Sequence, residues 1–192
     1  MVIRFNLGYF TMNTAYTIGH STRKIEEFIS LLTGNHIQLL IDVRRFPGSR
    51  RHPHFNKGNL EQSLQEGNIN YRHMEILGGR RGKPEKNSNN DGWKSEGFQA
   101  YSDYINTSEV QEVINELSKL SQNTRYALMC AEALYWQCHR QLIADALVAR
   151  EIPVNHILGP GQLEKHSLRD MAQIMEDKRV VYPSRQQGLF KD

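Results

Sequence analysis

The sequence contains little cysteine and no long apolar run. Its 2 cysteines, Cys130 and Cys138, are too few for the disulfide framework that stabilises many small secreted proteins. No stretch approaches the ~20 consecutive apolar residues that a membrane-spanning helix needs. The first residues, MVIRFNLGYFTM, have only a short, interrupted apolar segment and no small-residue cleavage site. We therefore expect a cytoplasmic protein with reduced cysteines and no membrane association.

Several signatures of nucleotide and hydrolase chemistry are also missing. Neither a GxxxxGKS or GxxxxGKT phosphate loop nor a GxGxxG fingerprint after a strand occurs. The nucleophile elbow GxSxG and the zinc-protease motif HExxH are absent as well. The glycine-rich segment LGGRRG at 77–82 matches neither phosphate fingerprint. Nucleoside triphosphate hydrolysis and dinucleotide redox chemistry thus have no support, and the sequence identifies no cofactor.

The apolar pattern alternates between strand-like and helix-like periods. A chain of 192 residues, of which 39% are apolar and 23% charged, suits one globular domain. Alternating strands and helices predict a single three-layer α/β domain, in which helices flank a mostly parallel, Rossmann-like sheet. We expect this domain at residues 15–183, between an N-terminal extension at 1–14 and a C-terminal tail at 184–192.

The expected elements follow from apolar spacing and from turn and capping residues. Predicted strands lie at 15–19, 37–43, 69–74, 126–130, 154–158 and 180–182. Predicted helices run from a Ser21 or Thr22 cap to Gly34, over 59–65, 96–105 and 109–121, and from His139 onward; an amphipathic segment covers 168–175. Residues 77–94, rich in Gly, Asn and Ser, form a long loop of the kind that is often functional.

Positive charge is concentrated in two segments, although the net charge is only +3. The segment 44–57 holds four arginines and Lys57 without any acid, and the segment 72–86 holds five more basic residues against Glu75 and Glu85. Such a local positive face attracts phosphates and other anions. The alternative is an ordinary solvated basic surface. The pattern therefore predicts a phosphorylated small molecule or a nucleic acid as partner.

Polar residues follow several predicted strands at the point where each strand ends. In open parallel sheets, ligands bind beyond these carboxyl ends. The residues involved are His20 and Ser21, then Asp42, Arg44 and Arg45, then Cys130 and Glu132, and finally Gly159. Glu132, Asp42 and His20 are the acid–base candidates, with His139 as a supporting catalytic residue. For Asp42, structural pairing with a nearby arginine is the competing interpretation.

Arginines and aromatic residues supply candidates for substrate binding. Guanidinium groups bind phosphate bidentately, which suits Arg44 and Arg45 after their strand and Arg80 in the glycine-rich loop. Ring stacking on a base suits Trp93. Ser21, Arg81 and Arg140 complete the predicted binding residues.

Both cysteines lie near residues that can alter thiol chemistry. Cys138 precedes His139 and Arg140, which can lower a thiol pKa and create a nucleophile. A Cys/Cys/His set can also hold a soft metal. Inert burial as small apolar side chains is the alternative for both. Because four ligands at finger-like spacing are absent, we expect no structural zinc and assign no metal.

Several segments together resemble one family. They are TIGHS at 17–21, IDVRRFPGSRRHPHFN at 41–56, LGGRR at 77–81, MCAEALYWQCHR at 129–140, ADAL at 144–147 and HILGPG at 156–161. The chain is similar, from about Tyr16 to Pro183, to the uncharacterised prokaryotic family known as domain of unknown function 488. The resemblance implies one α/β domain and makes the GHS, DVR, GGRR, CAE and CHR segments its site. It implies no particular reaction.

A weaker similarity is to rhodanese-like domains, which also place Asp-x-Arg after one strand and Cys after a later one. Those domains and Cys-based phosphatases surround the cysteine with a short anion-binding loop of Gly or Arg. Here Cys130 is followed by AEALYW, without Gly or Arg, and Glu132 would repel an anionic intermediate. This departure disfavours sulfur transfer or phosphatase chemistry at Cys130.

The residues therefore favour an enzyme of the hydrolase or glycosidase type that cleaves a bond in a phosphorylated, nucleotide-like or nucleic-acid substrate. Carboxylates without a cofactor motif suit hydrolytic cleavage. Two alternatives remain open: a non-catalytic nucleic-acid-binding module, and a rhodanese-like or metal-dependent cysteine site.

Overall fold

The protein forms a six-stranded sheet whose strands are mostly parallel. The computed structural model describes residues 13–184, so most of the predicted extension and tail lie outside the described residues. The strand order is β3-β2-β4-β1-β5-β6, with β1 Ala15–Gly19, β2 Leu39–Asp42, β3 Asn70–His73, β4 Tyr126–Cys130, β5 Val154–Gly159 and β6 Gln162–Lys165. Within this sheet, as described for residues 13–184, β6 pairs antiparallel with β5 and the other pairs are parallel. A short hairpin of β7 Gln173–Ile174 and β8 Val180–Val181 lies outside the sheet.

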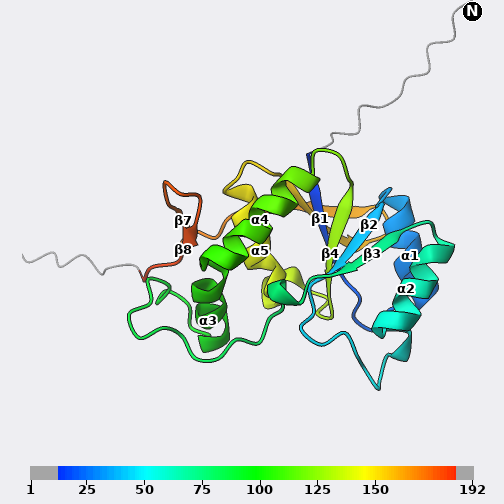
Figure 1. Cartoon of the computed structure of the whole chain (residues 1–192), viewed down its shortest axis with the longest axis horizontal. Coiled ribbons are helices and arrows are strands. Elements are labelled where there is room, and N and C mark those ends of the chain that lie inside the picture. The colour runs from blue at the N-terminus through cyan, green and yellow to red at the C-terminus, as the bar shows by residue number, and fades with distance from the viewer. Residues whose placement is uncertain (1–12, 185–192) are drawn as a thin grey trace, which may run out of the picture.

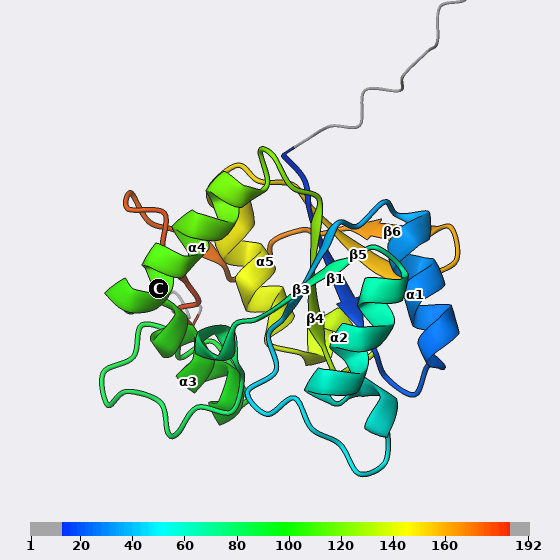
Figure 2. The same cartoon turned by 45° about the vertical axis from the view of Figure 1, so that its right-hand side comes forward.

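Helices cover both faces of the sheet, which confirms the predicted three-layer α/β domain. One face carries α1 Ile25–Gly34 and α2 Lys57–Glu66; the other carries α3 Glu96–Ile105, α4 Ser108–Leu120 and α5 Arg140–Val148 (Figures 1 and 2). A separate apolar core fills each interface. Among residues 13–184, no helix has the length and apolar character required to cross a bilayer.

The alternation of side chains along the strands decides which core each residue enters. In β4, Leu128 and Cys130 join the core beneath α3, α4 and α5, whereas Ala127 and Met129 join the core beneath α1 and α2. In β2, Ile41 belongs to the first core and Leu40 to the second. Residues at the strand ends are therefore divided between the two faces of the sheet.

The structure departs from the predicted elements in three places. Helix α1 begins at Ile25 with Lys24 as its N-cap, because Ser21, with a left-handed φ of +49°, lies within the turn that the Arg23 N–H to His20 carbonyl bond closes. The antiparallel strand β6 was not predicted; its four residues are all exposed, so it carries no burial pattern. The amphipathic segment 168–175 forms a turn and β7, because its Gln173 and Ile174 pair with β8.

Candidate active site at the carboxyl edge of the sheet

The first cluster at the carboxyl edge is a buried ion pair between Asp42 and Arg44. Asp42 is fully buried and Arg44 is 6% exposed. The Asp42 Oδ2 atom accepts hydrogen bonds from Arg44 Nη2 at 2.6 Å and from the Tyr71 hydroxyl at 2.9 Å. Its Oδ1 atom accepts from the Arg44 backbone N–H at 3.0 Å and from Nε at 2.9 Å. Both carboxylate oxygens are thus satisfied, which favours the structural interpretation of Asp42.

Most of the Arg44 guanidinium is committed to partners within the protein. Besides Asp42, its Nη2 atom donates to the Phe55 carbonyl oxygen at 2.8 Å. Its Nη1 atom lies 3.3 Å from His20 Nε2. This buried arginine is therefore placed to hold the carboxyl edge together, whereas the side chains of Arg45 and Arg80 are exposed.

His20 is buried beside Arg44, and its contacts define its protonation. Its ring stacks on Phe55 with centroids 4.2 Å apart. Its Nδ1 atom lies 2.9 Å from the Ser21 carbonyl oxygen, which can only accept, while Nε2 faces the guanidinium of Arg44, which can only donate. Burial and the nearby charge of Arg44 lower the pKa of His20 to about 4. The imidazole is therefore neutral at pH 7, with its lone pair on Nε2.

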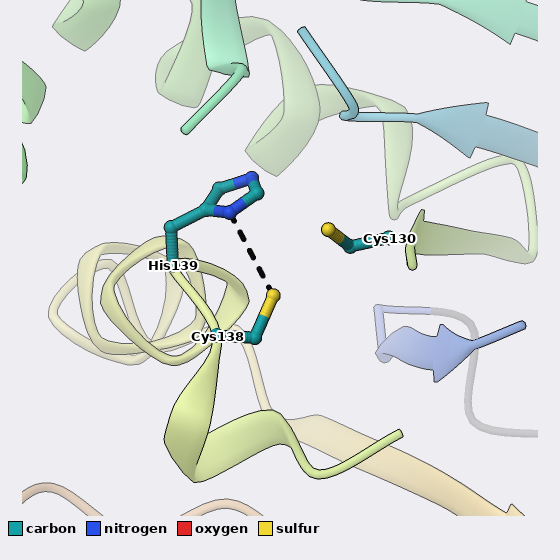
Figure 3. A group of neighbouring side chains, drawn as sticks. All are labelled: Cys130, Cys138 and His139. Atoms are coloured by element: carbon teal, nitrogen blue, oxygen red, sulfur yellow. Dashed lines mark hydrogen bonds between the residues drawn. The ribbon is translucent and has the colours of Figure 1, made fainter. Parts of the chain in front are cut away.

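The second cluster, on the opposite face of the sheet, consists of Cys130, Cys138 and His139. Figure 3 shows the Cys130 sulfur at the end of β4 pointing toward the other two side chains, which stand at the start of α5. The Cys138 sulfur lies 3.6 Å from His139 Nδ1. The Arg140 Nε–H donates to the Cys138 sulfur at 3.3 Å. The structure thus brings Cys130 beside Cys138 and His139, which follow it by eight and nine positions in the sequence.

The two thiols differ in acidity. The hydrogen bond with Cys138 and burial raise the pKa of Cys130 well above its usual value. Burial opposes ionisation of Cys138 too, but the hydrogen bond from Cys130 and the neighbouring His139 and Arg140 outweigh it and hold the Cys138 pKa well below its usual value. Of the two thiols, Cys138 is therefore the more acidic.

Arginines and a carboxylate form the exposed rim of the edge. Arg45 Nη1 donates to the Arg80 carbonyl oxygen at 2.6 Å, and both side chains are exposed. Glu132 is also exposed, and its backbone oxygen accepts from Arg140 Nη2 at 2.5 Å. Arg81 instead lies over the Tyr104 ring at 3.5 Å. Arg45, Arg80 and Glu132 are thus the predicted residues whose charged groups face solvent.

Trp93 is not brought to this rim by any contact of its ring. It packs against Phe98 and Tyr182, with ring centroids 5.0 and 5.1 Å away, and Arg169 lies over it. Its ring is used to close the core beneath α3, so the prediction that it stacks on a substrate base has no geometric support here. Ser21 contributes its backbone, since its N–H donates to the Ala131 carbonyl oxygen.

A series of buried side-chain hydrogen bonds links Thr17 to Asp145 through two histidines, and the sequence did not reveal it. Thr17 Oγ1 contacts His156 Nδ1 at 2.7 Å, His156 Nε2 contacts His166 Nδ1 at 2.9 Å, and His166 Nε2 contacts Asp145 at 2.7 Å. The Tyr182 hydroxyl donates to the same carboxylate at 2.7 Å. Because the Asp145 carboxylate can only accept, the His166 Nε2–H donates to it.

This chain joins β1, α5, β5 and the C-terminal segment. Burial, together with the neighbouring His166 and Arg140, lowers the pKa of His156 to about 3. Tyr135 stacks on the His156 ring with centroids 3.5 Å apart. The sequence held one signal for this chain of hydrogen bonds: His156 lies within an otherwise apolar strand segment. A histidine buried in a strand needs hydrogen-bonding partners inside the protein.

Comparison with known proteins gives one match. The family model described as "Domain of unknown function DUF488" matches residues 24–147, a span that contains the Asp42–Arg44 pair, the glycine-rich loop and the Cys130–Cys138–His139 cluster. No curated protein and no solved structure matches the chain. Since the family model covers most of the chain, including nearly every residue of both clusters, the protein belongs to the DUF488 family.

Proposed function

We propose that the protein is an enzyme that cleaves a bond in a phosphorylated, nucleotide-like or nucleic-acid substrate at the carboxyl edge of the sheet. One observation carries the proposal: the loop at Gly78 and Gly79 packs tightly between the exposed arginines and the cysteine cluster. A Cβ on Gly78 would lie 2.8 Å from Arg45 Cα, and one on Gly79 would lie 2.9 Å from His139 Nδ1. One short loop therefore contacts both the segment that carries Arg45 and the His139 ring of the cysteine cluster.

The proposed roles follow from exposure and from available hydrogen-bonding atoms. Arg45 and Arg80 bind the phosphate, because their guanidinium groups reach solvent. Glu132 acts as general acid or base from the loop that Arg140 holds in place. His20 is left out of the proposed proton transfer, because Ser21 and Arg44 engage both of its ring nitrogens. Asp42 and Arg44 position the strand ends without taking part in proton transfer.

The test measures turnover of phosphosugars, nucleotides and short single-stranded and duplex DNA by the purified chain. With the substrate that is cleaved, Glu132→Gln is expected to lower kcat by about 10²–10⁴-fold, the usual contribution of one acid–base group. Glu66→Gln, which changes an exposed carboxylate at the end of α2, is the matched control and should retain wild-type kcat. Equal kcat in wild type and Glu132→Gln would remove Glu132 from the mechanism.

A second candidate, a nucleic-acid-binding module, is favoured by one surface feature. Phe46 is 65% exposed next to Arg45, whose guanidinium lies 5.4 Å from the ring centroid. Arg50, Arg51 and Lys57 are exposed in the same segment. Exposed aromatic rings among arginines stack on unpaired bases while the charges follow the phosphates.

This candidate predicts binding of single-stranded DNA that weakens steeply with salt. Phe46→Ala should weaken it by about 1–3 kcal/mol, the usual value of one stacked base, and Glu132→Gln should leave it unchanged. Fluorescence anisotropy at several salt concentrations gives the number of phosphates contacted from the slope. Affinity that is independent of salt would exclude this candidate.

A further inference from the structure

We propose that Cys130, Cys138 and His139 form a binding site for one Zn²⁺ ion, with three protein ligands and a fourth position left for water or substrate. The site goes beyond the proposed function, because its existence is tested by metal binding and needs no turnover. Its use in catalysis would rest on the proposed function.

The ligand types are those that zinc prefers. Two sulfur atoms and one imidazole nitrogen, one from each residue, lie within 4.8 Å of one another. Two cysteines and one histidine with an open fourth position are an established ligand set of catalytic zinc sites, whereas structural sites are closed by four protein ligands. Within residues 13–184, no further His, Cys, Asp or Glu joins this group. Three protein ligands therefore correspond to a zinc site of the catalytic type, with an open fourth position.

The spacing of the ligand atoms fits a tetrahedral ion. Zinc–sulfur and zinc–nitrogen bonds of about 2.3 and 2.0 Å place S and N about 3.5 Å apart across a tetrahedral corner. The Cys138 sulfur and His139 Nδ1 are 3.6 Å apart. The Cys130 side chain approaches the same point from the end of β4 (Figure 3). The three ligand atoms, which lie within 4.8 Å of one another, would have to approach by about 1 Å to enclose an ion with these bond lengths.

The partners around the three ligands orient them for a metal. His139 Nε2 lies 3.1 Å from the Val43 carbonyl oxygen, which can only accept, so Nε2 carries the proton and the lone pair is on Nδ1, facing the sulfurs. Ligating histidines typically donate their other ring N–H to a carbonyl or carboxylate in this manner. The Arg140 Nε–H that reaches the Cys138 sulfur at 3.3 Å would likewise hold a ligating thiolate.

Glycine at position 79 lets the loop backbone lie close over the face of the His139 imidazole. A Cβ there would lie 2.9 Å from His139 Nδ1 and 3.3 Å from the adjacent Cε1. Any side chain at this position would therefore press on the nitrogen that is proposed to bind the ion. The glycine-rich loop thus allows close approach of backbone to the site, and it carries Arg80 past it.

A zinc ion held by these three residues would supply a nucleophile and a Lewis acid to the carboxyl edge of the sheet. A bound water with lowered pKa is a nucleophile at neutral pH, and the ion also polarises a phosphoryl or carbonyl oxygen. The Gly78–Gly79 loop packs on the Arg45 backbone and continues into Arg80, whose carbonyl oxygen accepts from Arg45. The class of substrate that fits is an anionic ester or amide whose phosphate reaches these arginines.

The test uses the full chain, reduced with a phosphine, stripped of metal and titrated with Zn²⁺ against a chromogenic chelator. One equivalent should bind, and Co²⁺ in its place should show a thiolate-to-cobalt charge-transfer band. Cys138→Ser and His139→Gln should weaken Zn²⁺ binding by more than the 10- to 100-fold that loss of an outer partner causes. His54→Gln, a histidine outside the site, is the control and should bind as the wild type does.

Two results would overturn the site: no stoichiometric Zn²⁺ binding by the folded, reduced wild type, or unchanged affinity in a folded Cys138→Ser protein. The Co²⁺ spectrum of the wild type keeps the proposal testable if a variant does not fold. Zinc binding without turnover of any phosphorylated substrate would contradict the proposed function and support the site. Turnover of a phosphorylated substrate by protein that binds no zinc would support the proposed function and contradict the zinc site.

Discussion

Lowering the pH below about 6.5 is expected to destabilise this protein by roughly 2.7 kcal/mol per pH unit, because two buried histidines stay neutral in the fold. The folded-state pKa is about 4 for His20 and about 3 for His156, against 6.5 in the unfolded chain. At a pH between the folded-state and unfolded-state pKa values of each histidine, the unfolded state binds more protons than the folded state. The stability is therefore complete above pH 6.5 and is lost progressively as the pH falls.

The surroundings of both histidines explain why protonation is unfavourable. Burial is the largest cause for each. His20 faces the guanidinium of Arg44 and, more weakly, His52, while the Asp42 charge opposes them only in part. His156 faces Thr17, His166 and the Tyr135 ring, with Arg140 close by. Each histidine contributes about 1.4 kcal/mol per pH unit, and two pH units approach the lower end of a domain's total stability of ~5–15 kcal/mol.

Urea unfolding followed by circular dichroism from about pH 5 to about pH 7.5 measures this slope. His20→Gln and His156→Gln should each reduce the slope by about half, and the double variant should remove most of it. The region above pH 7 is an internal control, where the wild type and all variants should show little dependence on these groups. A wild-type free energy of unfolding that stays constant between pH 5 and pH 6.5 would contradict the prediction.

Much of the fold could be predicted because its elements carry strong local signals. The bounds of Ala15–Gly19, Glu96–Ile105 and Tyr126–Cys130 match the predictions, since two of them are continuous apolar strands and the third is a helix with the serine cap Ser95. The alternation of strands and helices along the sequence also predicted a parallel sheet. In such a sheet the carboxyl ends of the strands meet at one edge, so the polar residues that follow the strands were expected there. β6 was missed because every residue in it is exposed.

The arrangement of the site could not be predicted to the same depth. Asp42 at the end of β2 pairs with Met129 of β4, and the next residue, Cys130, faces the opposite side of the sheet, so Asp42 and Cys130 share an edge but belong to separate clusters. The loop Gly78–Gly79 reaches His139 across sixty positions of sequence, through contacts that no local pattern encodes. The chain from Thr17 to His156 joins residues 139 positions apart and depends on β1 and β5 being neighbours.

Removing the guanidinium of Arg44 is expected to lower the free energy of unfolding by about 3–5 kcal/mol, because it leaves the Asp42 carboxylate buried without a charged partner. Arg44→Met preserves most of the side-chain volume, so the loss reports charge rather than a cavity. The Phe55 carbonyl and His20 Nε2 lose a donor as well. Urea denaturation at pH 7 measures the change, with the urea dependence checked for a constant slope.

An exposed pair of equal length provides the matched control. Arg72 Nη1 lies 2.7 Å from Glu116, against 2.6 Å for Arg44 and Asp42, but its two side chains are 48% and 56% exposed, against 6% and 0%. Arg72→Met should therefore cost only about 0–1 kcal/mol. Adding Asp42→Asn to Arg44→Met should restore part of the stability, because no unpaired charge then remains buried while the amide oxygen still accepts from Tyr71. Equal losses for Arg44→Met and Arg72→Met, or no gain from Asp42→Asn, would show that this ion pair does not organise the carboxyl edge.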